Sequence, residues 1–196
     1  MKGYIINLDR RPDRWVVVRE EVISHGFTPA RFSAIDTKPG WRGCAASHLA
    51  VMEECRNEEH FMIFEDDAMF QYEKEAFMAI YHKALEQLPT DFDCLFLGAS
   101  PQEPQERYSD NLFRIKNSFC THSILWHNRE GGAIEYILKN RCRVNKIDVF
   151  FSKEIFPIFN CFLVYPLICV QRESKSDTCT RSDVNILKEN YKLYCV

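Results

Sequence analysis

Three features that often reveal a protein's class are missing from the sequence: a long apolar run, a C-x-x-C pair and a glycine-rich phosphate loop. No apolar stretch approaches the ~20 residues of a membrane-spanning helix, so we expect no membrane span. The apolar run Tyr4–Ile6 is followed at once by Asn7 and charged residues, which predicts no secretory signal and a cytoplasmic location. The lack of a phosphate loop argues against a nucleotidyltransferase that needs one.

Strong charge of either sign is missing as well. The net charge is −3, and no long basic run interrupts a chain that is 27% charged and 46% hydrophobic. Nucleic acid and anionic membranes are therefore not expected as partners. A chain of 196 residues with this composition is most simply one soluble globular domain that buries roughly two thirds of its unfolded surface.

Cysteine is plentiful, with nine residues, but the spacing lacks the paired pattern of a structural zinc site. An odd number of cysteines without a secretion signal also argues against a disulfide framework. Cys94, Cys161 and Cys169 stand among apolar neighbours, where a free cysteine behaves as a small hydrophobe. We expect reduced, buried cysteines and a reducing compartment.

The most informative stretch is an apolar run, Phe61–Phe64, that is closed by three carboxylates, Glu65, Asp66 and Asp67. The apolar run predicts a buried strand, and the cost of burying adjacent charges places the carboxylates at its exit. There they repel one another unless a cation compensates them, and their oxygens suit Mg²⁺ or Mn²⁺. A solvated acidic turn is the alternative interpretation.

Around this stretch, strands alternate with helices, which predicts an α/β domain with a mainly parallel sheet and mixed edges. The spacing of apolar residues, the caps and the breakers predict strands at 3–8, 30–36, 61–64, 93–98 and 162–166, and helices at 12–26, 44–55, 73–88 and 129–139. Residues 112–115 and 119–126 are expected to form a hairpin-like pair.

Two local features admit both a functional and a structural interpretation. The first strand runs directly into a helix start near Arg10, Arg11 and Arg14, a place suited to phosphate or nucleotide. Surface solubility explains three arginines equally well. His48 near the start of a later helix is either a ligand, a hydrogen-bond donor to a bound sugar or a structural side chain.

Taken together, several segments resemble glycosyltransferase family 25, which includes lipooligosaccharide β-galactosyltransferases and collagen galactosyltransferase domains. The resemblance covers about residues 3–177. The matching segments are Ile5–Arg14, Phe32–Asp36, Gly43–His48, Ile63–Asp67, Phe92–Gly98, Ile147–Phe150 and Pro166–Asp177.

The resemblance implies a GT-A fold, in which a Rossmann-like half binds a nucleotide sugar and a second half binds the acceptor. We expect a single domain over 1–196, with a nucleotide-sugar half at about 1–98, an acceptor half at about 99–178 and a tail at 179–196. The acidic triplet then takes the role of the family's metal-binding motif. Because side chains alternate in an extended segment, Glu65 and Asp67 are expected to hold Mn²⁺ or Mg²⁺ while Asp66 points elsewhere.

The resemblance also implies a UDP-sugar donor, most simply UDP-galactose, and transfer of a hexose with inversion to a glycan or glycoprotein hydroxyl, as in lipopolysaccharide biosynthesis. UDP-glucose or another nucleotide sugar, and a catalytically inactive nucleotide-binding module, are the alternatives. The residues expected to bind the donor are Asn7, Leu8, Arg11, Arg14, Ser33, Ala34, Asp36, Ser47, His48 and Asp66.

Inverting transfer needs a base that takes the proton of the acceptor hydroxyl. Asp148 is the candidate, since it is a carboxylate in an apolar segment that the family pattern also carries. The alternative is that Asp148 caps a helix. Glu173 and Asp177 are weaker candidates for the base.

Overall fold

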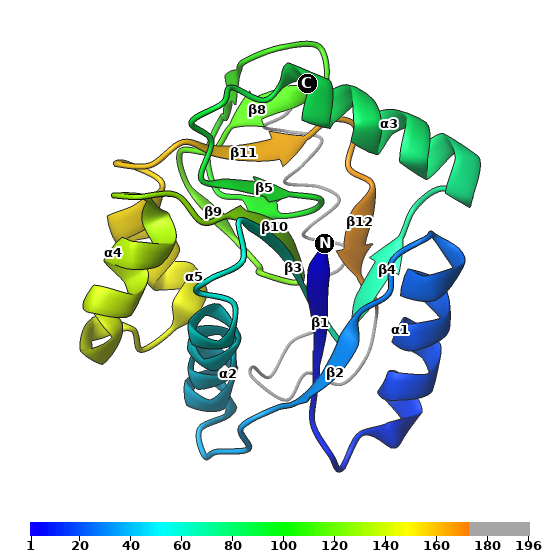
Figure 1. The fold of residues 1–196 in the computed structure, drawn as a ribbon, viewed down its shortest axis with the longest axis vertical. Coiled ribbons are helices and arrows are strands. Elements are labelled where there is room, and N and C mark those ends of the chain that lie inside the picture. The colour runs from blue at the N-terminus through cyan, green and yellow to red at the C-terminus, as the bar shows by residue number, and fades with distance from the viewer. Residues whose placement is uncertain (173–196) are drawn as a thin grey trace.

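The computed structural model describes residues 1–172. An eight-stranded sheet forms the centre of this part of the chain (Figure 1). Its strand order is β2-β1-β3-β10-β5-β11-β8-β7. The strands are β1 Lys2–Asn7, β2 Ala30–Ser33, β3 His60–Glu65, β5 Cys94–Phe96, β7 Glu106–Arg107, β8 Leu112–Arg114, β10 Ser123–His127 and β11 Cys161–Val164. Two small sheets pair β4 Ala68–Phe70 with β12 Cys169–Gln171, and β6 Ser100–Pro101 with β9 Ser118–Phe119.

Helices cover both faces of the large sheet. One face carries α1 (Pro12–Ser24) and α3 (Lys74–Gln87), and the other carries α2 (Gly40–Glu54), α4 (Ala133–Lys139) and α5 (Ile147–Phe150) (Figure 1). A 3₁₀ turn at Arg141–Arg143 and a π-helical turn at Phe151–Ile155 follow α4 and α5.

The apolar run of β3 shows why the sheet takes this three-layer form. Successive side chains of a strand point to opposite faces. Phe61 and Ile63 pack in the core beneath α2 and α4, whereas Met62 and Phe64 pack in the core beneath α1 and α3. All four are at most 1% exposed. A strand that is apolar at every position therefore requires helices on both faces.

The predicted class is confirmed: the domain is α/β, with a mixed central sheet flanked by helices. Six of the eight strands run in one direction, and only β10 and β8 oppose them. β10 comes from the second half of the chain and lies between β3 and β5 of the first half. The two predicted halves thus share one sheet.

The main predicted elements are confirmed within a few residues at their ends, whereas the predicted hairpin is wrong. Residues 112–114 pair with β11 and β7, and 123–127 pair with β3 and β5. Apolar runs predict strands but not their partners, because pairing between distant segments is set by the whole sheet. The helix predicted from residue 129 begins at Ala133.

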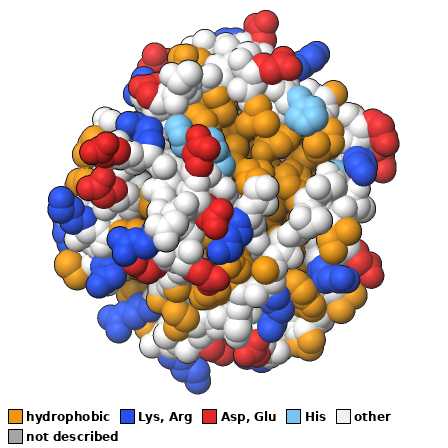
Figure 2. Space-filling model, in the orientation of Figure 1, with side chains coloured by type: hydrophobic (Ala, Val, Ile, Leu, Met, Phe, Trp, Pro, Cys, Tyr) orange, Lys and Arg blue, Asp and Glu red, His pale blue; other side chains and the backbone are white. Residues whose placement is uncertain are grey.

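The predicted packing role of three cysteines is also confirmed. Cys94, Cys161 and Cys169 are free and completely buried. Among residues 1–172 no helix has the length and apolar character required to cross a lipid bilayer. Acidic and basic side chains are interspersed on the face shown in Figure 2. The predicted tail at 179–196, and the alternative bases Glu173 and Asp177, lie outside the described residues.

Candidate active site

The carboxyl ends of three adjacent parallel strands meet at one edge of the large sheet. β1 ends at Asn7, β2 at Ser33 and β3 at Glu65, and the β1 register places Asn7 opposite Ser33 and Ile6 opposite Glu65. In open α/β sheets, ligands bind outside the carboxyl ends of the strands. This edge therefore gathers many of the predicted site residues.

Glu65 is held by two side chains from different elements. His48 Nε2 in α2 lies 3.0 Å from Glu65 Oε1, and the Thr121 hydroxyl donates to the same oxygen at 2.6 Å. Burial acts to raise the pKa of Glu65, but these hydrogen bonds and the charge of His48 outweigh burial and lower the pKa. Glu65 is therefore an ionised acceptor, and its second oxygen receives no hydrogen bond from residues 1–172.

Asp66 turns toward β1 and α1. Its carboxylate accepts a hydrogen bond from Asn7 Nδ2 at 2.8 Å and forms an ion pair with Arg14 at 2.7 Å. Burial raises the pKa of Asp66 even though Arg14 and Asn7 act to lower it. Asn7 is completely buried and also accepts hydrogen bonds from Arg31 at 2.8 and 3.0 Å. Asp66 thus links strand β3 to the first strand–helix unit.

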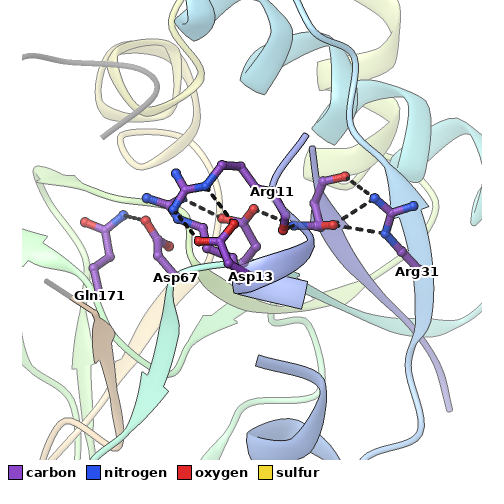
Figure 3. A network of polar contacts seen from close by, with 8 residues as sticks. Arg11, Asp13, Arg31, Asp67 and Gln171 are labelled. Carbon is purple, nitrogen blue, oxygen red and sulfur yellow. Dashed lines mark hydrogen bonds and ion pairs between the residues drawn. The ribbon is translucent and has the colours of Figure 1, made fainter. Parts of the chain in front are cut away.

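Asp67 is the least compensated of the three carboxylates. Gln171 Nε2 in β12 approaches Asp67 Oδ2 at 3.5 Å (Figure 3). Asp67 Oδ1 is buried and has no hydrogen-bond partner among residues 1–172. Burial, followed by the charges of Glu65 and Asp66, raises the pKa of Asp67 to about 8. A buried carboxylate oxygen without a donor is costly unless another group compensates it.

A divalent cation fits this arrangement. Carboxylate oxygens are the ligands that Mg²⁺ and Mn²⁺ prefer, and a cation beside Asp67 would offset the repulsion that raises its pKa. Glu65 and Asp67 are the residues that would hold such an ion, because each has a carboxylate oxygen that no other residue of 1–172 engages.

A second group of potential ligands, which the sequence analysis did not identify, shares Glu65. Cys44 Sγ, a nitrogen of His48 and an oxygen of Glu65 all lie within 4.8 Å of one another. Cys44 and His48 are four residues apart in α2, so they stand on one face of the helix. Their spacing in the sequence is the signal that would have pointed to this group.

Asp148 lies near the same carboxylates, although its segment is distant in sequence. The Cys44 thiol senses all four carboxylates. Burial raises its pKa well above the usual value, and the charges of Glu65, Asp148, Asp67 and Asp66 add to that rise. Burial raises the pKa of Asp148 too, and the charge of Glu65 adds to that rise. α2 and α5 thus bring Asp148 to the edge where β3 ends.

The alternative interpretation of Asp148 as a helix cap is wrong. Lys146 is the N-cap of α5, and Asp148 is the second residue of that helix. Its Oδ1 accepts a hydrogen bond from the backbone N–H of the next residue, Val149, at 2.8 Å. The role of a base stays a prediction.

Two arginines predicted to bind the donor differ in their surroundings. Arg14 is 11% exposed and paired with Asp66. Arg11 is 20% exposed and binds Asp13 (Figure 3). The backbone N–H of Arg11 donates to the carbonyl of Leu8 at 2.9 Å. Leu8 and Arg11 therefore form the turn between β1 and α1, beside the polar edge.

The predicted residues that follow β2 form a more exposed polar rim. The Ser33 hydroxyl donates to Asp9 at 2.8 Å, and Asp36 forms an exposed ion pair with Arg10 at 2.9 Å. The backbone N–H of Ala34 donates to the carbonyl of Asn7 at 3.0 Å. The segment is thus tied to the end of β1.

Ser47 occupies a structural position inside α2. It is completely buried, its hydroxyl donates to the carbonyl of Gly43 at 2.7 Å, and the backbone N–H of Ile35 donates to it at 2.8 Å. Ser47 thus joins α2 to the rim after β2. Gly43 permits that close approach, because a Cβ there would lie 2.1 Å from the carbonyl oxygen of Ile35.

Substituting Gly43 by alanine is expected to lower the free energy of unfolding by about 2 kcal/mol, within the range for overpacking a close contact. Chemical denaturation measures the change. Gly3→Ala is the matched control, because a Cβ at Gly3 would meet its nearest neighbour at an ordinary 3.5 Å. Equal stability of the two variants would contradict the close approach of α2 to Ile35.

Comparison with known proteins finds a family match for the central part of the chain. Residues 39–124 match the family model described as glycosyltransferase family 25 (LPS biosynthesis protein). This stretch, called the family 25 stretch below, is similar to glycosyltransferase family 25. The resemblance inferred from the sequence is confirmed, and the family 25 stretch contains Cys44, His48, Glu65, Asp66 and Asp67. No curated protein matches the chain.

Solved structures share the fold at low sequence identity. A197 from STIV has a TM-score of 0.51 and 10% identity over 89% of this chain and 86% of its own. A glycosyltransferase involved in the glycosylation of the major capsid of PBCV-1 has a TM-score of 0.50 and 11% identity over 83% and 80%. At these identities the likeness concerns the fold alone.

Proposed function

We propose that the chain is a nucleotide-sugar glycosyltransferase of the GT-A type. It moves a hexose, galactose from UDP-galactose in the first instance, to a hydroxyl of a glycan or glycoprotein with inversion, and it requires Mn²⁺ or Mg²⁺. The family 25 stretch supports glycosyl transfer in general, and its description as an LPS biosynthesis protein favours a lipopolysaccharide-type glycan. The donor sugar, the metal and inversion are the proposed refinements.

The observation that carries the proposal is the uncompensated Asp67. Its buried Oδ1 has no donor among residues 1–172, and Glu65 beside it has a second oxygen that those residues leave without a hydrogen bond. A bound divalent cation would supply electrostatic stabilisation of the departing diphosphate. Arg14 and Asn7 hold Asp66 and thereby fix the turn that carries Asp67.

The chain's own residues account for the remaining steps. Arg11 and the β1–α1 turn offer positive charge and backbone groups to the nucleotide, and Ser33, Ala34 and Asp36 form the rim for uracil or ribose. Asp148 takes the proton of the acceptor hydroxyl while the hydroxyl oxygen bonds to the anomeric carbon and the nucleotide leaves. Its raised pKa makes Asp148 a better base than an exposed aspartate.

Replacing Asp148 by asparagine is expected to lower kcat by roughly 10²- to 10⁴-fold, because an amide cannot accept the proton. KM for the donor should change little, since Asp148 acts on the acceptor. Steady-state kinetics with saturating acceptor measure both parameters. Asp110→Asn is the control, because Asp110 is 97% exposed and lies between β7 and β8, at the opposite side of the sheet from β1, β2 and β3. A kcat near that of the unmodified protein would remove Asp148 from the mechanism.

A panel of nucleotide sugars tests the function itself. UDP release is measured from UDP-galactose, UDP-glucose and other donors, each with Mn²⁺ and with chelator. We expect metal-dependent release with UDP-galactose preferred. Preference for UDP-glucose would revise the donor only. Donor binding without release under any condition would favour the inactive nucleotide-binding module, and release in chelator would overturn the metal requirement.

A further inference from the structure

A second cluster of metal-ligand residues lies at the opposite end of β3. His60 is the first residue of β3 and Glu65 the last, which separates them by roughly 17 Å at ~3.3 Å per residue. His127, the last residue of β10, stands directly opposite His60 in the antiparallel pair. The two imidazole rings are stacked, with centroids 4.5 Å apart and planes 16° apart.

The hydrogen bonding of His127 leaves one ring nitrogen suited to a metal. His127 Nδ1 lies 2.8 Å from the backbone carbonyl of Phe92. A carbonyl oxygen only accepts, so Nδ1 carries the proton and Nε2 presents its lone pair. A carbonyl that fixes the tautomer in this way is the usual outer partner of a metal-bound histidine. The ring of Phe92 packs against both imidazoles.

Glu59 completes the cluster. One of its carboxylate oxygens lies 4.0 Å from His60 Nδ1, and a ligand atom from each of Glu59, His60 and His127 lies within 4.8 Å of the other two. The Glu59 side chain is 80% exposed and can rotate toward the rings, whereas its carbonyl is fixed by the N–H of Asn128 at 2.8 Å. Histidine and acidic side chains reach the surface shown in Figure 2.

We propose that Glu59, His60 and His127 bind a divalent first-row cation of the zinc type. Two imidazoles and one carboxylate form a ligand set that zinc favours, and the fourth position of a tetrahedral site stays open to solvent. Hard cations such as Mg²⁺ prefer oxygen ligands and are excluded from this role. Bound zinc would tie the ends of β3 and β10 together and raise the thermal stability of the domain.

Because the cluster is remote from Glu65, zinc bound here leaves the proposed transfer reaction unaffected, and the two proposals can fail separately.

Zinc titration of the full chain, followed by the ring signals of its six histidines in long-range ¹H–¹⁵N spectra, tests the proposal. We expect Zn²⁺, and not Mg²⁺, to shift the signals of His60 and His127. His60→Asn and His127→Asn should each weaken zinc binding at least ~10-fold. An asparagine at 127 can still donate to the Phe92 carbonyl, so that variant should fold and transfer sugar at the unmodified rate.

His82→Asn is the matched control, because His82 is exposed on α3 and should bind zinc no differently from the unmodified protein. Three results would overturn the site: no shift of the two rings, shifts confined to His48 beside Cys44 and Glu65, or equal zinc affinity in the His127→Asn and His82→Asn proteins.

Discussion

Replacing Asp67 by alanine is expected to reduce turnover of the nucleotide sugar about a thousandfold. Loss of a carboxylate that holds a catalytic cation removes several kcal/mol of transition-state stabilisation, and about 4 kcal/mol corresponds to three powers of ten in rate. UDP release under saturating donor and Mn²⁺ measures the change. Asp67 is assigned to the cation because its Oδ1 is buried beside Glu65 and Asp66 and receives no hydrogen bond from residues 1–172.

Asp110→Ala is the matched control, since it removes an equally charged side chain that is 97% exposed. That variant should turn over the donor at the unmodified rate. If Asp67→Ala retained more than about a tenth of the rate, its loss would amount to less than ~1.4 kcal/mol, too little for a ligand of the catalytic cation.

The second large effect is a gain: replacing Asp67 by asparagine is expected to raise the stability of the protein, although it removes the catalytic carboxylate. In the folded, metal-free protein the pKa of Asp67 is raised from 3.8 to about 8 by burial and by Glu65 and Asp66. The folded state therefore holds a proton that the unfolded state releases between these values. The free energy of unfolding falls as pH rises through this window. Asparagine resembles the protonated carboxyl and avoids that loss.

Asp67→Asn is thus expected to stabilise the metal-free protein by about 2 kcal/mol at a pH of about 8, less than the full linkage value because three carboxylates share the repulsion. For a domain of this size that gain corresponds to a Tm higher by about 5 °C. Calorimetry in chelator at about pH 8 and about pH 4 measures it, with a smaller difference expected at the lower pH. If Asp67→Asn were less stable than Asp110→Asn at the higher pH, the claim that Asp67 is uncompensated in the metal-free protein would be contradicted.

A gain in stability together with a loss of activity would separate a functional carboxylate from a structural one. If Asp67 had a structural role, its substitution would lower both stability and activity, because the contacts of Asp67 would stabilise the fold. Residues that are arranged for a ligand rather than for the fold commonly show this trade-off.

Much of the fold follows from local patterns in the sequence. The apolar run Phe61–Phe64 predicts a strand buried on both faces, and both cores of the protein receive side chains from it. The partners of the later strands do not follow. β10 lies between β3 and β5, and β8 lies beside β11, because the pairing of distant segments depends on which edge the rest of the sheet leaves open.

The part of the candidate site that could be predicted is the part that directly follows a strand in the sequence. Three consecutive carboxylates after an apolar strand point to the edge where Asp67 lies. Thr121 and Gln171, which contact Glu65 and Asp67, carry no such signal, because a single polar residue in a distant segment reveals nothing about its partner. The pairing of His60 with His127 is likewise visible only once the register of β3 and β10 is known.

The most direct test of the proposed site is a titration of Mn²⁺ into the protein in the presence of UDP, followed by electron paramagnetic resonance of the free ion. We predict that the unmodified protein and Asp110→Asn bind a single equivalent of Mn²⁺ at the carboxyl end of β3, and that Asp67→Asn and Glu65→Gln bind it at least ~10-fold more weakly. Unchanged Mn²⁺ binding in both of the latter variants would contradict a catalytic metal at this edge of the sheet.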